Sequence, residues 1–172
     1  MGQRLLLTLT QLSLLCLAKL LNNPFEAMVA FQIQRYFVAT KQMIIDFLAN
    51  EFPQSKCVLE AIGERTSIVS HTVGFNELRP GGTVSGPLLM TVADVALYTA
   101  VLGELGLVAL AVTSNLSINF LTKPAADKDI VGYAKLTKVG RTLVMGEVML
   151  YSRGVEQPVA QVMGTYVLPA DG

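Results

Sequence analysis

The stretch "RPGGTVSGPLLMTVADVALYTAV", residues 79–101, decides the fold of this chain. A glycine-rich turn leads directly into an apolar run that is long enough for a helix of several turns. Gly86 and Pro87 mark the expected start of this helix and Gly103 its end, because proline suits a first helical turn and glycine follows a last one. The helix predicted over residues 87–102 is apolar on almost every side, which indicates that other elements surround it.

The rest of the chain supplies elements that can surround such a helix. Residues 25–50 space apolar side chains three and four apart and predict an amphipathic helix. Residues 56–75 alternate and are rich in β-branched side chains, which predicts one or two strands with a break near residues 63–65. Four further strands are expected over residues 110–121, 129–139, 142–152 and 158–168.

Short connections between these strands favour antiparallel pairing, because parallel neighbours need long crossovers. The predicted fold class is therefore α+β: one antiparallel sheet wrapped around a long central helix, with an extra N-terminal helical segment. In the strand over residues 110–121 the odd positions from Thr113 to Asn119 are polar, and the apolar even positions are Leu110, Val112, Leu116, Ile118 and Phe120. Asn115 and Ser117 lie on that polar face, where they either line a site or form hydrogen bonds across a subunit contact.

Composition limits the classes of function. The chain has 172 residues, of which 52% are hydrophobic and 15% charged, and this apolar balance favours an additional buried surface such as a subunit interface. The formal net charge is zero and no basic stripe is present, so nucleic-acid binding is not expected. The two cysteines, Cys16 and Cys57, allow a disulfide by count alone. No spacing suits metal ligands, and a cytoplasmic location is the default expectation.

The N-terminal segment over residues 1–23 has the layout of a secretory signal peptide, with one arginine, an apolar stretch and then Lys19. As a membrane span it is short and contains several polar side chains, so no membrane partner is expected. Two interpretations are favoured over a cleaved leader. The segment is a retained helix, or the start codon is placed upstream of the true start at Met28 or Met43.

One carboxylate, Asp94, stands in the middle of the apolar central helix. Thr91, Asp94 and Tyr98 are spaced three and four apart, so they share one face of the helix. A carboxylate in such surroundings must be paired or hydrogen-bonded. Asp94 is therefore either structural, bonded to Tyr98 or to a neighbouring loop, or it is a base or nucleophile.

The start of the same helix offers complementary chemistry. The free backbone N–H of Gly86, at the positive end of the helix dipole, suits a developing oxyanion. Gly86 and Asp94 are eight residues apart, which is about 12 Å along a helix. One helix cannot present both groups to the same carbonyl, but two copies related by a two-fold axis can. We therefore expect a homodimer, or a homotetramer built from two such dimers.

The wrapping sheet, the glycine turn and the mid-helix acid together resemble the hotdog fold, and residues 57–168 resemble acyl-CoA thioesterases of the phenylacetyl-CoA and hydroxybenzoyl-CoA type. That family carries Asn-x-x-Gly-x-x-His-Gly-Gly, with an acid nine residues after the histidine. Without a gap, Gly82, Ser85, Gly86 and Asp94 fall on the glycine, histidine, second glycine and acid positions. The chain departs from the pattern at three positions, with Arg79 for the asparagine, Ser85 for the histidine and Pro87 for the last glycine.

The resemblance implies roles for individual residues. Asp94 activates water or attacks the thioester directly, while the Gly86 N–H of the partner subunit polarises the carbonyl. Pro87 has no N–H to offer, and Ser85 becomes a helix cap. Arg141 lies on a hairpin where the family meets the phosphates of CoA, although a solvated turn arginine is an equal alternative. The residues expected to contact substrate are Ser85, Thr91, Tyr98, Asn115 and Arg141.

The predicted function is therefore an acyl-CoA thioesterase that hydrolyses an acyl- or aryl-CoA without a metal or cofactor. The alternative is a non-catalytic hotdog protein that binds acyl-CoA or a lipid ligand. His71 is the only histidine and lies within a strand, so a structural role is expected for it rather than a place in a Ser-His-Asp triad. The predicted division is a helical extension over residues 1–53 and a hotdog thioesterase-like domain over residues 54–172.

Overall fold

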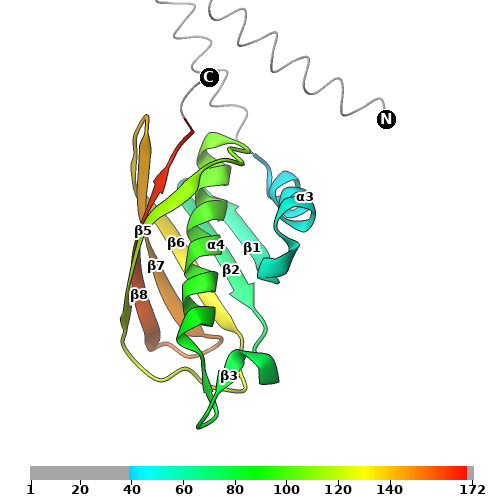
Figure 1. Cartoon of the computed structure of the whole chain (residues 1–172), viewed down its shortest axis with the longest axis vertical. Coiled ribbons are helices and arrows are strands. Elements are labelled where there is room, and N and C mark those ends of the chain that lie inside the picture. The colour runs from blue at the N-terminus through cyan, green and yellow to red at the C-terminus, as the bar shows by residue number, and fades with distance from the viewer. Residues whose placement is uncertain (1–38, 170–172) are drawn as a thin grey trace, which may run out of the picture. The chain divides into compact units, whose positions relative to one another are not determined.

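The computed structural model of the chain describes residues 39–169. A six-stranded antiparallel sheet, in the order β1-β2-β6-β7-β8-β5, curves around one long helix, α4 (Gly86–Leu105) (Figure 1). The strands of this sheet are β1 (Val58–Gly63), β2 (Thr66–His71), β5 (Val112–Phe120), β6 (Ile130–Val139), β7 (Leu143–Ser152) and β8 (Pro158–Val167). The predicted α+β class, with a sheet wrapped around a central helix, is confirmed.

Shorter elements complete the described residues. Helix α3 (Lys41–Glu51) precedes β1, and the strands β3 (Leu78–Arg79) and β4 (Thr83–Val84) pair with each other just before α4. Two single-turn 3₁₀ helices are also present, η1 (Pro53–Ser55) and η2 (Phe75–Glu77).

The core lies between α4 and the concave face of the sheet, and the apolar residues of α4 are buried on several sides of the helix. Leu97 shows how closely the sheet approaches. Gly146 and Gly164 face each other across β7 and β8, and Leu97 is seated on this pair. A Cβ added at Gly146 would lie 2.7 Å from Leu97 Cδ2, so the missing side chains make room for the helix.

Helix α4 is longer than predicted and does not end at Gly103. It continues to Leu105, and Gly106, at φ 86°, ends it by donating its N–H to the carbonyl of Leu102 at 3.0 Å. Gly103 serves close packing instead of termination, since a Cβ there would lie 3.1 Å from Ile62 Cγ2 of β1. The sequence does not indicate which of the two glycines ends the helix. The close approach of β1 to Gly103 shows that Gly103 has a packing role.

Helix α3 ends close to the predicted position but begins later than predicted. Thr40 is extended, with ψ 156°, and its Oγ1 accepts a hydrogen bond from Met43 N at 3.3 Å. This side-chain cap starts the helix at Lys41, so the prediction of one continuous helix over residues 25–50 is wrong at Thr40. Residues 25–38 of that prediction, and the N-terminal segment over residues 1–23, lie outside the described residues.

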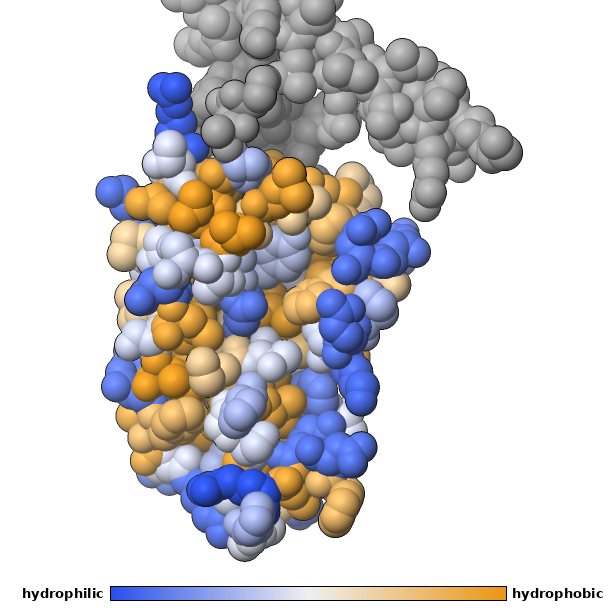
Figure 2. Space-filling model, viewed as in Figure 1, coloured by the Kyte–Doolittle hydropathy of each residue, from blue (hydrophilic) through white to orange (hydrophobic). Residues whose placement is uncertain are grey.

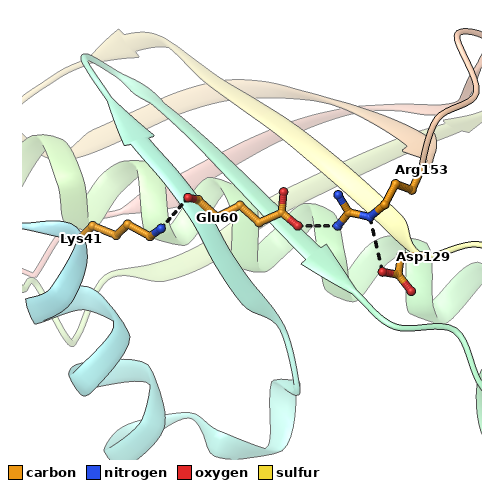
Figure 3. A network of polar contacts seen from close by, with 4 residues as sticks. All are labelled: Lys41, Glu60, Asp129 and Arg153. Atoms are coloured by element: carbon orange, nitrogen blue, oxygen red, sulfur yellow. Dashed lines mark hydrogen bonds and ion pairs between the residues drawn. The ribbon is translucent and has the colours of Figure 1, made fainter.

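A polar network joins α3 to the sheet (Figure 3). Lys41 Nζ donates to the carbonyl of Glu60 in β1 at 2.6 Å. Arg153, in the turn between β7 and β8, pairs with the Glu60 carboxylate and lies 3.4 Å, Nε to Oδ2, from Asp129 at the start of β6. The bond from Arg153 is the main reason that the pKa of Glu60 is lowered. Segments far apart in sequence are thereby connected at one edge of the sheet.

The glycine turn before α4 has the conformation that its sequence requires. Gly81 and Gly82 have φ values of 88° and 60°, a region that favours glycine because it has no Cβ. Gly82 N donates to the carbonyl of Arg79 at 3.1 Å, and Ser85 N donates to that of Glu77 at 2.9 Å. These bonds fix the point at which the chain enters α4.

Strand β5 forms one edge of the sheet and carries exposed apolar side chains. Among residues 39–169, β8 is its one partner strand. Leu110, Val112 and Phe120 are 74%, 59% and 57% exposed. Figure 2 shows hydrophobic residues gathered at the end of the described residues where α4 leads into β5. An exposed edge with this apolar character is suited to contact with another chain.

Candidate active site

The Asp94 carboxylate lies on the third turn of α4 and is half-buried. One of its oxygens, Oδ1, accepts two hydrogen bonds, from Thr113 Oγ1 at 2.7 Å and from Tyr166 Oη at 2.6 Å. Thr113 is on β5 and Tyr166 is on β8, and the two residues are register partners. The acid on the apolar helix is therefore hydrogen-bonded by two neighbouring strands, as a carboxylate in these surroundings requires.

A β-bulge directs Thr113 toward Asp94. The register of β5 against β8 shifts between Thr113 and Asn115, which leaves Ser114 as an extra residue. An extra residue interrupts the alternation of side chains along a strand, so Thr113 faces the helix together with Leu116, which packs against the core. Plain alternation places Thr113 on the polar face, and this prediction is wrong because the extra residue shifts the alternation at that point.

Tyr166 was not identified from the sequence either. Its side chain is buried, and burial raises its pKa, as does the neighbouring negative charge of Asp94. The hydroxyl therefore keeps its proton at ordinary pH and remains a donor to the carboxylate. In the sequence, Tyr166 is one tyrosine within an apolar strand. Its neighbours give no indication of a contact with a helix residue that is 72 positions away.

The second oxygen of Asp94 is open. Both hydroxyl donors contact Oδ1, and no residue within 39–169 donates a hydrogen bond to Oδ2. An ionised carboxylate with one fixed and one open oxygen can accept a proton from a water molecule or attack an electrophilic carbon. The geometry around Asp94 is therefore compatible with either of these two reactions.

The start of α4 carries the other predicted group. Gly86 is the first helical residue and Ser85 occupies the N-cap position, but Ser85 makes no side-chain hydrogen bond to the helix. The prediction that Ser85 caps the helix with its side chain is therefore wrong. A capping side chain normally accepts from the second or third helical N–H, and the second position here is Pro87, which has none.

A cavity of about 650 Å³ opens beside the start of α4. Its lining includes Arg79, Val84, Gly86, Phe120 and Lys123. The Phe120 ring packs over Gly86, since a Cβ added there would lie 3.2 Å from Phe120 Cζ. Because Gly86 has no side chain, its backbone borders this largely apolar cavity. Two of the lining residues, Arg79 and Lys123, are cationic.

Thr91 and Tyr98 do not hydrogen-bond to Asp94. Thr91 Oγ1 donates to the carbonyl of Pro87 at 3.0 Å, within its own helix. Tyr98 Oη donates to the carbonyl of Ala109 at 3.2 Å. The ring of Tyr98 stacks on that of Tyr166, with centroids 5.9 Å apart and planes at 11°. The alternative in which Tyr98 bonds Asp94 is therefore wrong, and Tyr98 contacts the site through its ring.

Asn115 and Arg141 are both exposed. Asn115 is on the edge strand β5, next to the bulge. Arg141 is in the turn between β6 and β7, at the end of the sheet where α4 finishes and far from Gly86 of the same chain (Figure 1). His71 is buried, with Nδ1 2.7 Å from the carbonyl oxygen of Thr72, as expected of a structural residue.

The comparisons with known proteins agree with this geometry. The profile of the thioesterase superfamily matches residues 81–159, from the glycine turn to the start of β8. A solved structure from Silicibacter sp. TM1040, of a protein named as a candidate thioesterase, is 39% identical in sequence. The match covers 80% of this chain and 96% of that chain, with a TM-score of 0.73. No curated protein matches the chain significantly.

Two more distant structures share the fold. The PaaI protein from the phenylacetic acid degradation operon of E. coli is 19% identical, with 75% of this chain and 92% of that chain covered and a TM-score of 0.66. A hypothetical thioesterase protein with coenzyme A from Streptococcus pneumoniae TIGR4 is 20% identical, with 74% and 98% covered and a TM-score of 0.63. The profile match and the Silicibacter relative, together with the fold, show that the chain belongs to the thioesterase superfamily and has the hotdog fold.

Proposed function

We propose that the protein is an acyl-CoA thioesterase that hydrolyses an acyl- or aryl-CoA, with Asp94 as base or nucleophile. The observation that carries this proposal is the state of the Asp94 carboxylate. Two hydroxyls hold Oδ1, and Oδ2 has no donor among the described residues. A purely structural carboxylate in an apolar helix would gain from using both oxygens, whereas a reactive one needs an oxygen that is open to water or substrate.

Two reaction courses fit this geometry. In the first, Asp94 Oδ2 takes a proton from water, the resulting hydroxide oxygen bonds to the thioester carbon, and a tetrahedral oxyanion forms. Breakage of the C–S bond then releases CoA as the thiolate and leaves the carboxylic acid, and the proton on Asp94 passes to the thiolate, which restores the carboxylate. In the second, Oδ2 itself bonds to the carbon, the thiolate leaves, and water hydrolyses the mixed anhydride. The thiolate is a good leaving group, so neither course needs a strong general acid.

The oxyanion in both courses needs a donor, and the Gly86 N–H is the candidate. Helix α4 runs without interruption through Gly86 and Asp94, so the two groups are about 12 Å apart along the helix axis. A single carbonyl cannot contact both within one chain. The site therefore combines Asp94 of one subunit with Gly86 of the partner subunit, and a two-fold axis produces two equivalent sites.

The edge strand β5 supports this homodimer. One edge of β5 has no partner strand in the part of the chain that the structure describes. This edge and the exposed apolar side chains of β5 lie beside Thr113, and Thr113 contacts Asp94. Contact between the β5 strands of two copies would bury these side chains and bring a second chain next to the acid. The dimer can assemble further into a tetramer, as the apolar composition also allows.

Arg141 is proposed to bind the phosphates of CoA. Arg141 is exposed in the turn between β6 and β7, and an exposed guanidinium can bind a phosphate in water. This turn lies at the end of the sheet where α4 finishes (Figure 1). Asn115, Tyr98, Thr91 and Ser85 are proposed to line the path of the substrate around Asp94 and Gly86. The Streptococcus pneumoniae structure with coenzyme A supports a CoA-type ligand for this fold.

Replacement of Asp94 by Asn tests the proposed chemistry. The Asn side chain keeps the shape and the acceptor oxygen for Thr113 and Tyr166 but removes the charge. Turnover of a panel of acyl-CoAs, followed by thiol release, should fall by at least ~100-fold, the low end for a lost general base. The melting temperature should stay constant or rise, because a half-buried charge has been removed.

The matched control is Asp46→Asn on the exposed face of α3, which should leave turnover unchanged. Normal turnover in a well-folded Asp94→Asn protein would end the catalytic role of Asp94. Tight binding of acyl-CoA by the wild-type protein without any hydrolysis would instead favour the non-catalytic ligand-binding alternative.

If the protein is the proposed homodimer, substitutions at two equally exposed valines should differ in their effect on dimer stability. Val112 on β5 and Val58 on the opposite edge strand β1 are 59% and 58% exposed in one chain. Val112→Lys should weaken the dimer, because it places a charge in the proposed contact, whereas Val58→Lys should not. Sedimentation velocity at micromolar concentration measures both. A folded wild-type monomer at that concentration would contradict the dimer.

Arg141→Ala should raise KM for acyl-CoA with little change in kcat. An exposed ion pair is worth up to about 1 kcal/mol, so the increase should be roughly twofold to fivefold and should diminish in high salt. Lys128→Ala removes an exposed cation at the opposite end of β6 and serves as the control. Equal losses in both kinetic constants for Arg141→Ala, or no change in KM, would count against this role.

A further inference from the structure

We propose that Tyr166 is a positioning residue, whose hydroxyl orients the Asp94 carboxylate so that Oδ2 faces the reacting carbon. This inference rests on the proposed thioesterase function. It adds a residue from the last strand of the sheet to a site otherwise assigned to α4 and β5.

The contact has the length of a charge-assisted hydrogen bond. Tyr166 Oη lies 2.6 Å from Asp94 Oδ1 and 3.0 Å from the backbone carbonyl oxygen of Asp94. The phenol has one proton, and bonds of the O–H···O⁻ type are typically about 2.5–2.7 Å long. The proton is therefore directed to the carboxylate. Tyr166 contacts both the backbone and the side chain of Asp94. Together these contacts hold the carboxylate in one orientation relative to α4.

The ring of Tyr166 is fixed by its surroundings. The residue is 3% exposed and stacks on Tyr98, and Tyr98 in turn packs at a tilt against Phe47 of α3, with centroids 6.3 Å apart. The Tyr98 hydroxyl is directed away from the acid, to the carbonyl of Ala109. The hydroxyl of Tyr166 is thus the one aromatic donor of this stack that reaches Asp94.

A second donor on the same oxygen matters because the terminal torsion of an aspartate is broad. Thr113 alone, from an exposed edge strand, leaves the carboxylate free to exchange its two oxygens. With Tyr166 also bonded to Oδ1, the plane of the carboxylate is fixed by groups from two strands. A reacting group displaced by about 1 Å can cost on the order of 100-fold in rate, so loss of this orientation should reduce turnover rather than substrate binding.

Two Tyr→Phe variants of the full chain test the proposal. Tyr166→Phe keeps the stacked ring and removes the donor to Asp94, so kcat should fall about 10- to 100-fold with KM little changed. Tyr133→Phe removes a hydroxyl from an exposed tyrosine on β6, outside the proposed site, and should leave both constants near those of the wild type. An unchanged kcat in Tyr166→Phe, or an equal loss in Tyr133→Phe, would overturn the proposal.

The Asp94→Asn background separates positioning from a general structural effect. If Tyr166 acts through the charged carboxylate, adding Tyr166→Phe to Asp94→Asn should reduce the residual turnover no further. A further drop of the same size would show that Tyr166 acts independently of Asp94 and would overturn the inference. Full turnover in Asp94→Asn alone defeats the proposed role of Asp94, and with it that of Tyr166, whereas slow Asp94→Asn with fast Tyr166→Phe defeats only the role of Tyr166.

Thr113→Val provides a second test should Tyr166→Phe fold poorly. It removes the other donor from the same oxygen at an exposed edge position, where an effect on folding should be small. A fall in kcat with KM preserved supports the view that donors to Oδ1 orient the acid. An unchanged kcat would contradict it.

Discussion

The hydrogen bonds from Thr113 and Tyr166 to one oxygen of Asp94 are the contacts on which the rest of the site depends. A carboxylate on an apolar helix loses much of its hydration, and the protein must replace it. Here the replacement comes from two neighbouring strands, so β5 and β8 must lie side by side in one register and β5 must contain its bulge. The pairing of β5 with β8 in this register is therefore needed both for the sheet and for the hydrogen bonds to Asp94.

Packing around α4 determines where this helix, and with it the site, lies against the sheet. Leu97 rests on the facing pair Gly146 and Gly164, which holds the middle of the helix against the sheet. The glycine turn fixes where the helix begins, and its continuity then sets Gly86 and Asp94 about 12 Å apart. In the proposed dimer, each chain would therefore contribute Asp94 to one site and Gly86 to the other. The exposed apolar edge of β5 is where a second copy would complete them.

Much of the architecture could be predicted because its signals are local: the apolar helix, the alternating strands, the glycine turn and the solitary acid are all visible within short windows. Most of the errors have non-local causes. Thr113 was placed on the wrong face because one extra residue in β5 shifts the alternation. Tyr166 was missed because its partner is 72 positions away. Ser85 forms no side-chain cap, and Pro87 lacks one of the two N–H groups that such a cap can use. Gly103 lies inside the helix, where the absence of a side chain leaves room for Ile62 of β1.

The most direct test of a shared site is a mixed dimer purified with two different tags. One chain carries Asp94→Asn. The other carries Gly86→Pro, which removes the donor N–H at the first helical position, where proline is common, after an extended Ser85 with ψ 145°. The Phe120 ring, 3.2 Å from the added Cβ, has to shift slightly to admit it. Each variant alone should be nearly inactive, whereas the mixed dimer has one intact site and should recover about half of the wild-type turnover. A mixed dimer no more active than its two parents would contradict a site built from Asp94 of one subunit and Gly86 of the other.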